Sequence, residues 1–66
     1  MMFLRIDERL KELNKNRNWL HKQTNISYAN IVNIANNNTS SIKWDVLERI
    51  CIALECNPGD IVIMKQ

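Results

Sequence analysis

The acidic and thiol residues are the first places to look for chemistry in this sequence. Asp45 and Glu48 stand three residues apart near the start of a predicted helix, a spacing that can pair two carboxylates. Acidic residues in a first helical turn stabilise the helix dipole, and we favour that role over acid–base catalysis. Cys51 and Cys56 lie five residues apart and His21 lies 30 residues before Cys51, whereas a zinc site needs about four ligands at short spacings. We therefore predict reduced thiols packed in the core, no metal site and no cofactor.

The rest of the sequence lacks the groupings that catalysis requires. No nucleophile, base and orienting group recur together, and the single glycine cannot form a glycine-rich phosphate loop. The 66 residues are 45% hydrophobic and 24% charged, values typical of one small globular domain. So short a chain has little core to spare for a substrate cavity. We predict that the protein is not an enzyme and binds no small-molecule ligand.

Hydropathy and charge indicate where such a domain would act. No apolar run approaches the roughly 20 residues of a membrane span, and residues 1–4 are too short for a signal-peptide core. We therefore expect a cytoplasmic protein. The net charge of +2 is too small to name a partner by itself. Six basic residues nevertheless fall in the first third, where they could face a polyanion: Arg5, Arg9, Lys11, Lys15, Arg17 and Lys22.

The N-terminal part of the chain predicts a strand followed by a helix. Residues 2–6 alternate between two sides, as a short strand does. Asp7 is the expected N-cap of the helix, which has Leu10 and Leu13 on one face. Residues 14–16 are expected to form the end of this helix and the turn after it.

Two short helices separated by a sharp turn are predicted next. The first covers residues 19–24, with Asn16 or Asn18 as its cap. Asn25 is expected to end it, because Asn tolerates the left-handed backbone conformation of a helix stop better than other residues except Gly. The second helix covers residues 27–36 and is capped by the serine at its start.

The C-terminal half predicts a further helix, a turn and a strand. Apolar residues recur at helical spacing over residues 44–55. Residues 57–60 combine Asn, Pro, Gly and Asp in a typical turn. The β-branched run over residues 61–64 predicts a strand that can pair with the N-terminal one. Trp19 and Trp44 are both expected in the core or at its edge.

The two short helices are arranged like a motif that binds DNA. Apolar anchors occur in both helices and in the turn between them: Leu20, Ile26, Ile31 and Ile34. These anchors would hold the helices at a fixed angle and project the N-terminal end of the second helix outward. A helix-turn-helix presents its recognition helix to the major groove in this way.

On these residues the sequence resembles the lambda repressor/Cro-type helix-turn-helix regulators, specifically their small phage-like members. The first matching positions are Leu20, Ile26, Ser27, Ile31 and Ile34. A second stretch, residues 41–60, resembles the fourth helix and closing turn of the family, and it is the more specific of the two. The resemblance implies an all-α, lambda repressor-like DNA-binding domain over residues 1–66, with four to five short helices and short N- and C-terminal β-strands.

The sequence departs from the family pattern at two positions of the motif. Asn25 stands where the turn usually has Gly, a change that the left-handed backbone tolerates. His21 stands where the family has a small Ala at the close approach of the two helices. Its imidazole must tilt the helices, point outward or form a hydrogen bond at their junction. We expect a structural role for it.

The resemblance also implies which residues meet DNA. The exposed face of the recognition helix would consist of Ser27, Tyr28, Ala29, Asn30 and Asn33. Asn can form a paired hydrogen bond with adenine, Ala can touch a thymine methyl group, and Tyr can reach a phosphate or a base edge. Contacts to the DNA backbone would come from Arg17, Lys22, Asn37 and Lys43.

The function implied is that of a sequence-specific regulator of transcription, a repressor that inserts residues 27–36 into the major groove of double-stranded DNA. One module makes few contacts, so we expect a homodimer joined through the apolar terminal strands, residues 3–6 and 61–64. An alternative is an antitoxin-like or anti-repressor module that binds a protein instead of DNA, since the net charge is low. RNA binding is less favoured, because an exposed aromatic platform for single strands is lacking.

Overall fold

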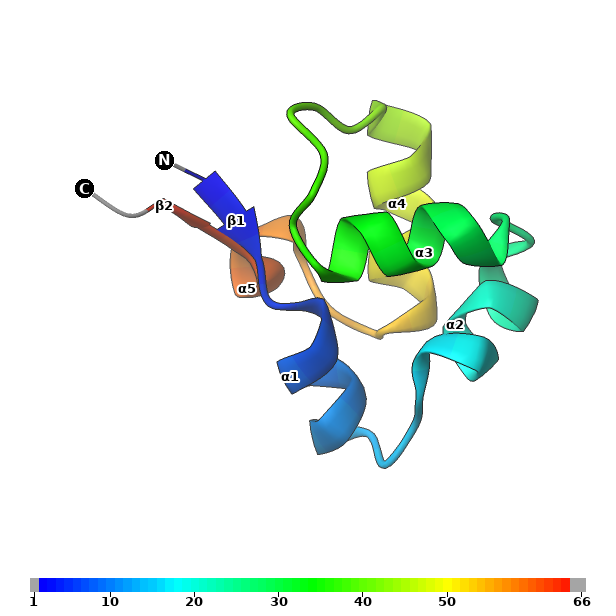
Figure 1. Cartoon of the computed structure of the whole chain (residues 1–66). Coiled ribbons are helices and arrows are strands. Elements are labelled where there is room, and N and C mark those ends of the chain that lie inside the picture. The colour runs from blue at the N-terminus through cyan, green and yellow to red at the C-terminus, as the bar shows by residue number, and fades with distance from the viewer. Residues whose placement is uncertain (1, 65–66) are drawn as a thin grey trace.

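The computed structural model describes residues 2–64, which form a bundle of short helices beside a small ribbon of two strands (Figure 1). The elements in chain order are β1 (Met2–Leu4), α1 (Ile6–Glu12), α2 (Arg17–Thr24), α3 (Tyr28–Ala35), α4 (Trp44–Ala53), α5 (Pro58–Ile61) and β2 (Val62–Met64). This arrangement confirms the predicted fold class. No helix of the described chain is long and apolar enough to cross a membrane.

Every helix contributes to one hydrophobic core. The five helices each supply a side chain that is at most 1% exposed: Ile6, Leu20, Ile31, Ile50 and Ile61. Leu54, just after α4, is also completely buried. Because the core has a member on every helix, no helix can move without opening the packing of the others.

The two terminal strands pair as predicted. β1 and β2 are antiparallel, with Met2 opposite Met64, Phe3 opposite Ile63 and Leu4 opposite Val62. Both strands are shorter than expected, because Ile6 and Ile61 belong to helices and are fully buried. These two isoleucines therefore cannot join the dimer interface that was predicted for the terminal segments.

The prediction that Asp7 caps the first helix is wrong. α1 begins at Ile6, with Arg5 in the N-cap position, and Asp7 lies in the first turn. The Arg5 N–H donates to the carbonyl of Ile61 at 2.8 Å, so the backbone leaves the ribbon directly into the helix. The burial of Ile6 requires this early start. The Asp7 carboxylate instead receives two hydrogen bonds from Arg17, at 2.9 and 2.6 Å.

The helix before the sharp turn begins earlier than predicted. α2 starts at Arg17, and of the two candidate caps Asn16 is the one used, since its Oδ1 accepts from the Trp19 N–H at 2.8 Å. Ser27 caps α3 as predicted, because its side chain accepts from the Asn30 N–H at 3.3 Å. α3 ends at Ala35, one residue before the predicted end.

The helix of the C-terminal half is shorter than predicted. α4 ends at Ala53, because Glu55 adopts a left-handed conformation with φ 52° and the Cys56 N–H turns back to the Cys51 carbonyl at 3.0 Å. Asp60 then accepts from the Asn57 N–H at 2.9 Å at the start of α5. The predicted turn at 57–60 is thus a short capped helix.

Only one of the two tryptophans lies at the core. Trp19 is half-buried against the core cluster, and Lys15 places its ammonium group 5.4 Å from the ring centroid. Trp44 is 85% exposed, so the prediction that it lies in the core or at its edge is wrong. Trp44 lies on the apolar stripe of α4, at the start of the helix, where other elements no longer cover that stripe.

The two cysteines are free thiols at the C-terminal end of α4, Cys51 in its last turn and Cys56 shortly after it. Cys51 is buried and Cys56 is half-buried. Burial raises the pKa of Cys51 to about 11 and also raises that of Cys56, so both remain protonated and unreactive near neutral pH. Among the residues described, no group of three His, Cys, Asp or Glu side chains could hold a metal ion.

Asp7→Asn tests the ion pair between α1 and α2. The hydrogen bond from Arg17 holds the pKa of Asp7 below its ordinary value of 3.8. A depressed carboxyl pKa stabilises the fold above about pH 4 and loses this effect as pH falls through the lowered pKa. Since the pair is largely exposed, we expect the substitution to cost at most about 1 kcal/mol of unfolding free energy at pH 7. Urea unfolding should show the difference shrinking as pH falls below about 4 and the Asp7 carboxyl of the unchanged protein becomes protonated, and a difference that stays constant with pH would contradict this role of the ion pair.

Candidate nucleic-acid interface

Three consecutive residues, the last of α2 and the first two of the turn after it, fix the junction between α2 and α3. Asn25 adopts the predicted left-handed conformation, with φ 59°, and its N–H donates to the His21 carbonyl at 3.0 Å. Thr24 is the one buried polar side chain of the described residues, and its hydroxyl donates to the Leu20 carbonyl at 2.7 Å. Ile26 is 7% exposed and belongs to the core cluster. The turn is therefore fixed by backbone geometry, a buried hydrogen bond and packing together.

His21 adds a further bond across this turn. Its Nδ1 forms a short hydrogen bond with the Ile26 carbonyl, and because a carbonyl only accepts, the histidine donates. The ring also meets Tyr28 edge to face, with centroids 5.9 Å apart and planes at 81°. Of the three possibilities left open by the sequence, the junction hydrogen bond is the one observed. His21 thus connects α2 to the turn and to the first residue of α3.

α3 divides into a buried face and an exposed face. Ile31, Ile34 and Ala35 point into the core and are at most 7% exposed. The opposite face is exposed and carries side chains that can reach a partner: Tyr28, Ala29, Asn30 and Asn33. In Figure 1 the helix runs from the α2–α3 turn towards the ribbon, so its N-terminal end lies far from the ribbon. The structure thus brings the predicted base-contacting residues together on one surface, which we call the α3 face.

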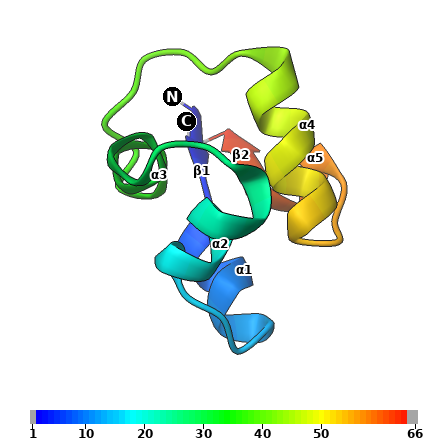
Figure 2. The same cartoon turned by 90° about the vertical axis from the view of Figure 1, so that its right-hand side faces the viewer.

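The charges around the α3 face suit the approach of an anion. Residues 13–44 contain no Asp or Glu, although they span α2, α3 and the following loop. Lys22 on α2 and Lys43 before α4 are both exposed. The loop at 36–43 crosses from α3 to α4 (Figure 2), so Lys43 lies at the end of that loop. Within residues 13–44 a phosphate backbone therefore meets only basic and neutral side chains. The Asp7 carboxylate near the end of α3 is paired with Arg17.

Two of the predicted backbone-contacting residues have partners within the protein. Arg17 donates to both carboxylate oxygens of Asp7 and, at 2.8 Å, to Oδ1 of Asn36. The side-chain amide of Asn37 bonds both polar groups of the Leu4 backbone. In the free protein, the side chains of Arg17 and Asn37 therefore form hydrogen bonds that attach α3 to neighbouring elements. Their predicted contacts with DNA remain predictions.

Sequence reasoning missed the partners in these contacts. Asp7 was expected to cap its own helix, and Asn36 was expected to end α3, so neither was paired with Arg17. The local signals were only the acidic residue after a strand and the run of three asparagines at 36–38. The buried Thr24 was not singled out either, although a threonine directly before a left-handed Asn is a natural place for a bond to the preceding helical turn.

The geometry defines a helix-turn-helix domain with an exposed recognition helix, and comparison with known proteins agrees. The family model of the Cro/C1-type HTH DNA-binding domain matches residues 5–66. YozG, described as an uncharacterized HTH-type transcriptional regulator of Bacillus subtilis (strain 168), is 34% identical over 61 residues, covering 92% of this chain and 73% of that protein. This chain therefore belongs to the Cro/C1-type helix-turn-helix DNA-binding family. The prediction of a DNA-binding regulator of this type is confirmed.

A solved structure supports the fold assignment. It is the crystal structure of a protein from Bacteroides fragilis that is described as a candidate DNA-binding protein. The two structures agree with a TM-score of 0.83 at 25% sequence identity, over 96% of this chain and all of the other. The similarity therefore extends over nearly the whole domain.

Asn33→Ala and Lys22→Ala should separate base contacts from phosphate contacts. Loss of one paired base contact should reduce discrimination between a selected duplex and its single-base variants by about 1–3 kcal/mol. Loss of a lysine near a phosphate should instead weaken all duplexes alike and reduce the log–log salt slope by about 0.9. Both effects can be measured by fluorescence anisotropy at several salt concentrations. Identical behaviour of the two variants would contradict the assignment.

Proposed function

We propose that this protein is a sequence-specific repressor that acts in the cytoplasm and inserts α3 into the major groove of double-stranded DNA. The observation that carries the proposal is the α3 face, an exposed polar surface on a helix whose other side is locked in the core. The stretch of chain that contains α3, residues 13–44, has no Asp or Glu.

The proposed contacts follow from the chemistry of the exposed residues. Asn30 and Asn33 would bond adenine edges, Ala29 would touch a thymine methyl group, and Tyr28 would reach a base edge or phosphate. Phosphates on either side would be held by Lys22, Lys43 and the start of α3 at Ser27, with Arg17 and Asn37 next to this surface. The low charge of the α3 face leaves specificity to hydrogen bonds and shape.

Two copies of the chain would bind DNA together, joined through their terminal ribbons. Asn37 covers the edge of β1 at Leu4, but the outermost pair of the ribbon, Met2 and Met64, is 60% and 69% exposed. The protein measures 32 Å in its longest direction. This length is comparable with the spacing of about 34–36 Å between half-sites one helical turn apart. A ribbon-to-ribbon dimer would also place the C-terminal ends of both α3 helices towards the dyad.

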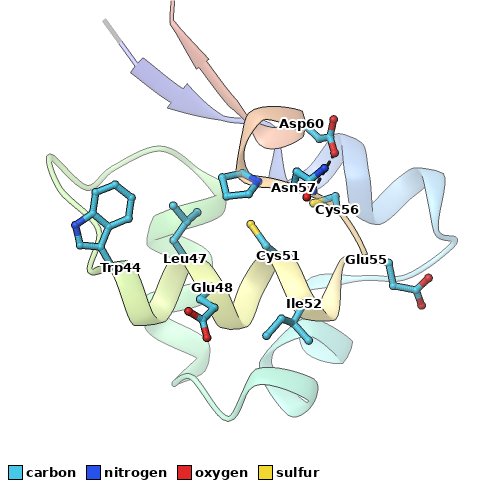
Figure 3. Close-up of a pocket in the computed structure, with 10 residues that line it drawn as sticks. Trp44, Leu47, Glu48, Cys51, Ile52, Glu55, Cys56, Asn57 and Asp60 are labelled. Carbon is cyan, nitrogen blue, oxygen red and sulfur yellow. Dashed lines mark hydrogen bonds between the residues drawn. The ribbon is translucent and has the colours of Figure 1, made fainter.

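An apolar surface beside the ribbon favours a second candidate function, a protein-binding module. Trp44 and Ile52 project from α4 into solvent, and they border an open depression between α4 and α5 (Figure 3). Trp44 also borders a second depression that reaches Met2 on β1. This surface is on α4 and the ribbon, so an occupant there would leave the α3 face exposed. Binding of a regulatory protein and binding of DNA are therefore compatible in this fold.

Selection from a random pool of duplexes tests the repressor proposal directly. The bound fraction should be enriched in one palindromic sequence, because two copies related by a dyad read two identical half-sites. The measurement is sequencing of the bound DNA at about 50 and 200 mM salt, with steep weakening expected at the higher value. Folded protein that enriches no sequence would move the assignment to the protein-binding module.

Met64→Lys tests the ribbon as the dimer contact. A lysine on an open strand edge blocks strand pairing, so the variant should be monomeric where the unchanged protein is dimeric. Ile52→Lys is the matched control, since Ile52 is equally exposed, at 69%, but lies on α4. Sedimentation equilibrium at high micromolar concentration gives the mass of each. A monomeric unchanged protein, or dissociation by Ile52→Lys alone, would contradict a ribbon contact.

A further inference from the structure

Asn37 occupies an unusual position at the end of the recognition helix. It follows α3 by two residues and has a left-handed backbone with φ 59°, which turns its side chain back towards β1. Its Oδ1 accepts from the Leu4 N–H at 2.6 Å, and its Nδ2 donates to the Leu4 carbonyl at 3.0 Å. The amide therefore pairs with Leu4 as a neighbouring strand would, across 33 positions of sequence.

Leu4 connects this contact to the rest of the ribbon. It pairs with Val62 of β2, and its side chain packs against the core cluster. The next residue, Arg5, donates its N–H to the Ile61 carbonyl at 2.8 Å. Leu4 is thus held between β2 on one side and the Asn37 amide on the other. Any shift of β1 relative to β2 would pull on the end of α3.

A second contact holds the same end of α3. Asn36, the C-cap of the helix, accepts from Arg17 at 2.8 Å, and Arg17 also binds the Asp7 carboxylate. The C-terminal end of α3 is therefore attached to the N-terminal segment of the chain at two neighbouring residues. The other end of α3 is held by the turn at Asn25 and by His21. With both ends fixed, the α3 face has one orientation relative to the ribbon.

We propose that Asn37 is a positioning residue: its amide fastens the end of α3 to β1, so that the terminal ribbon sets the orientation of the recognition helix on DNA. The inference rests on the proposed function of α3. This role differs from a phosphate contact, because it uses Oδ1 and one hydrogen of Nδ2, both directed at Leu4, and does not need the second Nδ2 hydrogen. If the ribbon joins two copies, the Asn37 amide also fixes the orientation of each α3 face relative to the dimer contact.

Asn37→Gly removes the amide but keeps the backbone, because glycine adopts a positive φ without strain. The matched control is Asn14→Gly, which makes the same change at a left-handed residue, φ 62°, in the turn after α1. The duplex selected from the random pool and a scrambled duplex of equal length are the probes. In Asn37→Gly the affinity ratio between them should fall about tenfold, the size of one lost base contact. Affinity for the scrambled duplex should change less than about twofold, and Asn14→Gly should leave both affinities unchanged.

A second measurement tests the contact between Asn37 and Leu4 in the absence of DNA. In the free protein, Asn37→Gly should speed hydrogen exchange at the Leu4 amide and change the residual dipolar couplings of α3 relative to those of α4. Should Asn37→Gly fail to fold, Asn37→Asp allows the couplings to be compared in the free protein, because it keeps the acceptor for the Leu4 N–H but sets an oxygen against the Leu4 carbonyl. Equal weakening towards both duplexes would indicate a phosphate contact and overturn the proposal, as would unchanged couplings. If the unchanged protein prefers no duplex, the proposed function fails, whereas the couplings still test the contact.

Discussion

The turn at Asn25 is the constraint on which the presentation of α3 depends. The left-handed Asn25 must redirect the chain within three residues, while Ile26 stays buried and Thr24 forms a hydrogen bond inside the protein. The His21 ring is larger than the Ala that the family has at this junction, but it is accommodated because it forms a hydrogen bond with the Ile26 carbonyl. The angle between α2 and α3 follows from these contacts. A polar α3 face on a helix free to pivot would have little power to discriminate between base pairs.

The opposite end of α3 depends on contacts between distant parts of the chain. Arg17 links α2 to α1 and to the end of α3, and Asn37 links the end of α3 to β1. These side chains are exposed or half-exposed, so each bond contributes little to the free energy of unfolding. Their effect is on orientation, since they act where a helix of eight residues would otherwise be held only by packing. Stability comes from the core, and the placement of the α3 face comes from the polar contacts around it.

The sequence predicted the features that are local and missed those that are long-range. Asn25, Ser27 and the apolar stripe of α3 have roles set by their immediate neighbours, so spacing and cap preferences were sufficient for them. The partners of Arg17 and Asn37 lie 10 to 33 positions away, and no local pattern encodes such a pairing. The prediction for Trp44 was wrong for a related reason. Its spacing places it on the apolar stripe of α4, but the sequence does not show how much of that stripe other elements cover. Asp7 has the right type for a cap, yet burial of Ile6 decided where α1 begins.

Two distinct surfaces emerge, the α3 face and the apolar surface of Trp44 and the ribbon, and the account assigns DNA to the first. Mapping backbone amide shifts by NMR during titration with the duplex selected from a random pool tests this assignment most directly. We expect the largest shifts between Ser27 and Asn33, with smaller ones at Lys22 and Lys43. Largest shifts on α4 around Trp44 and Ile52, with α3 unaffected, would contradict it.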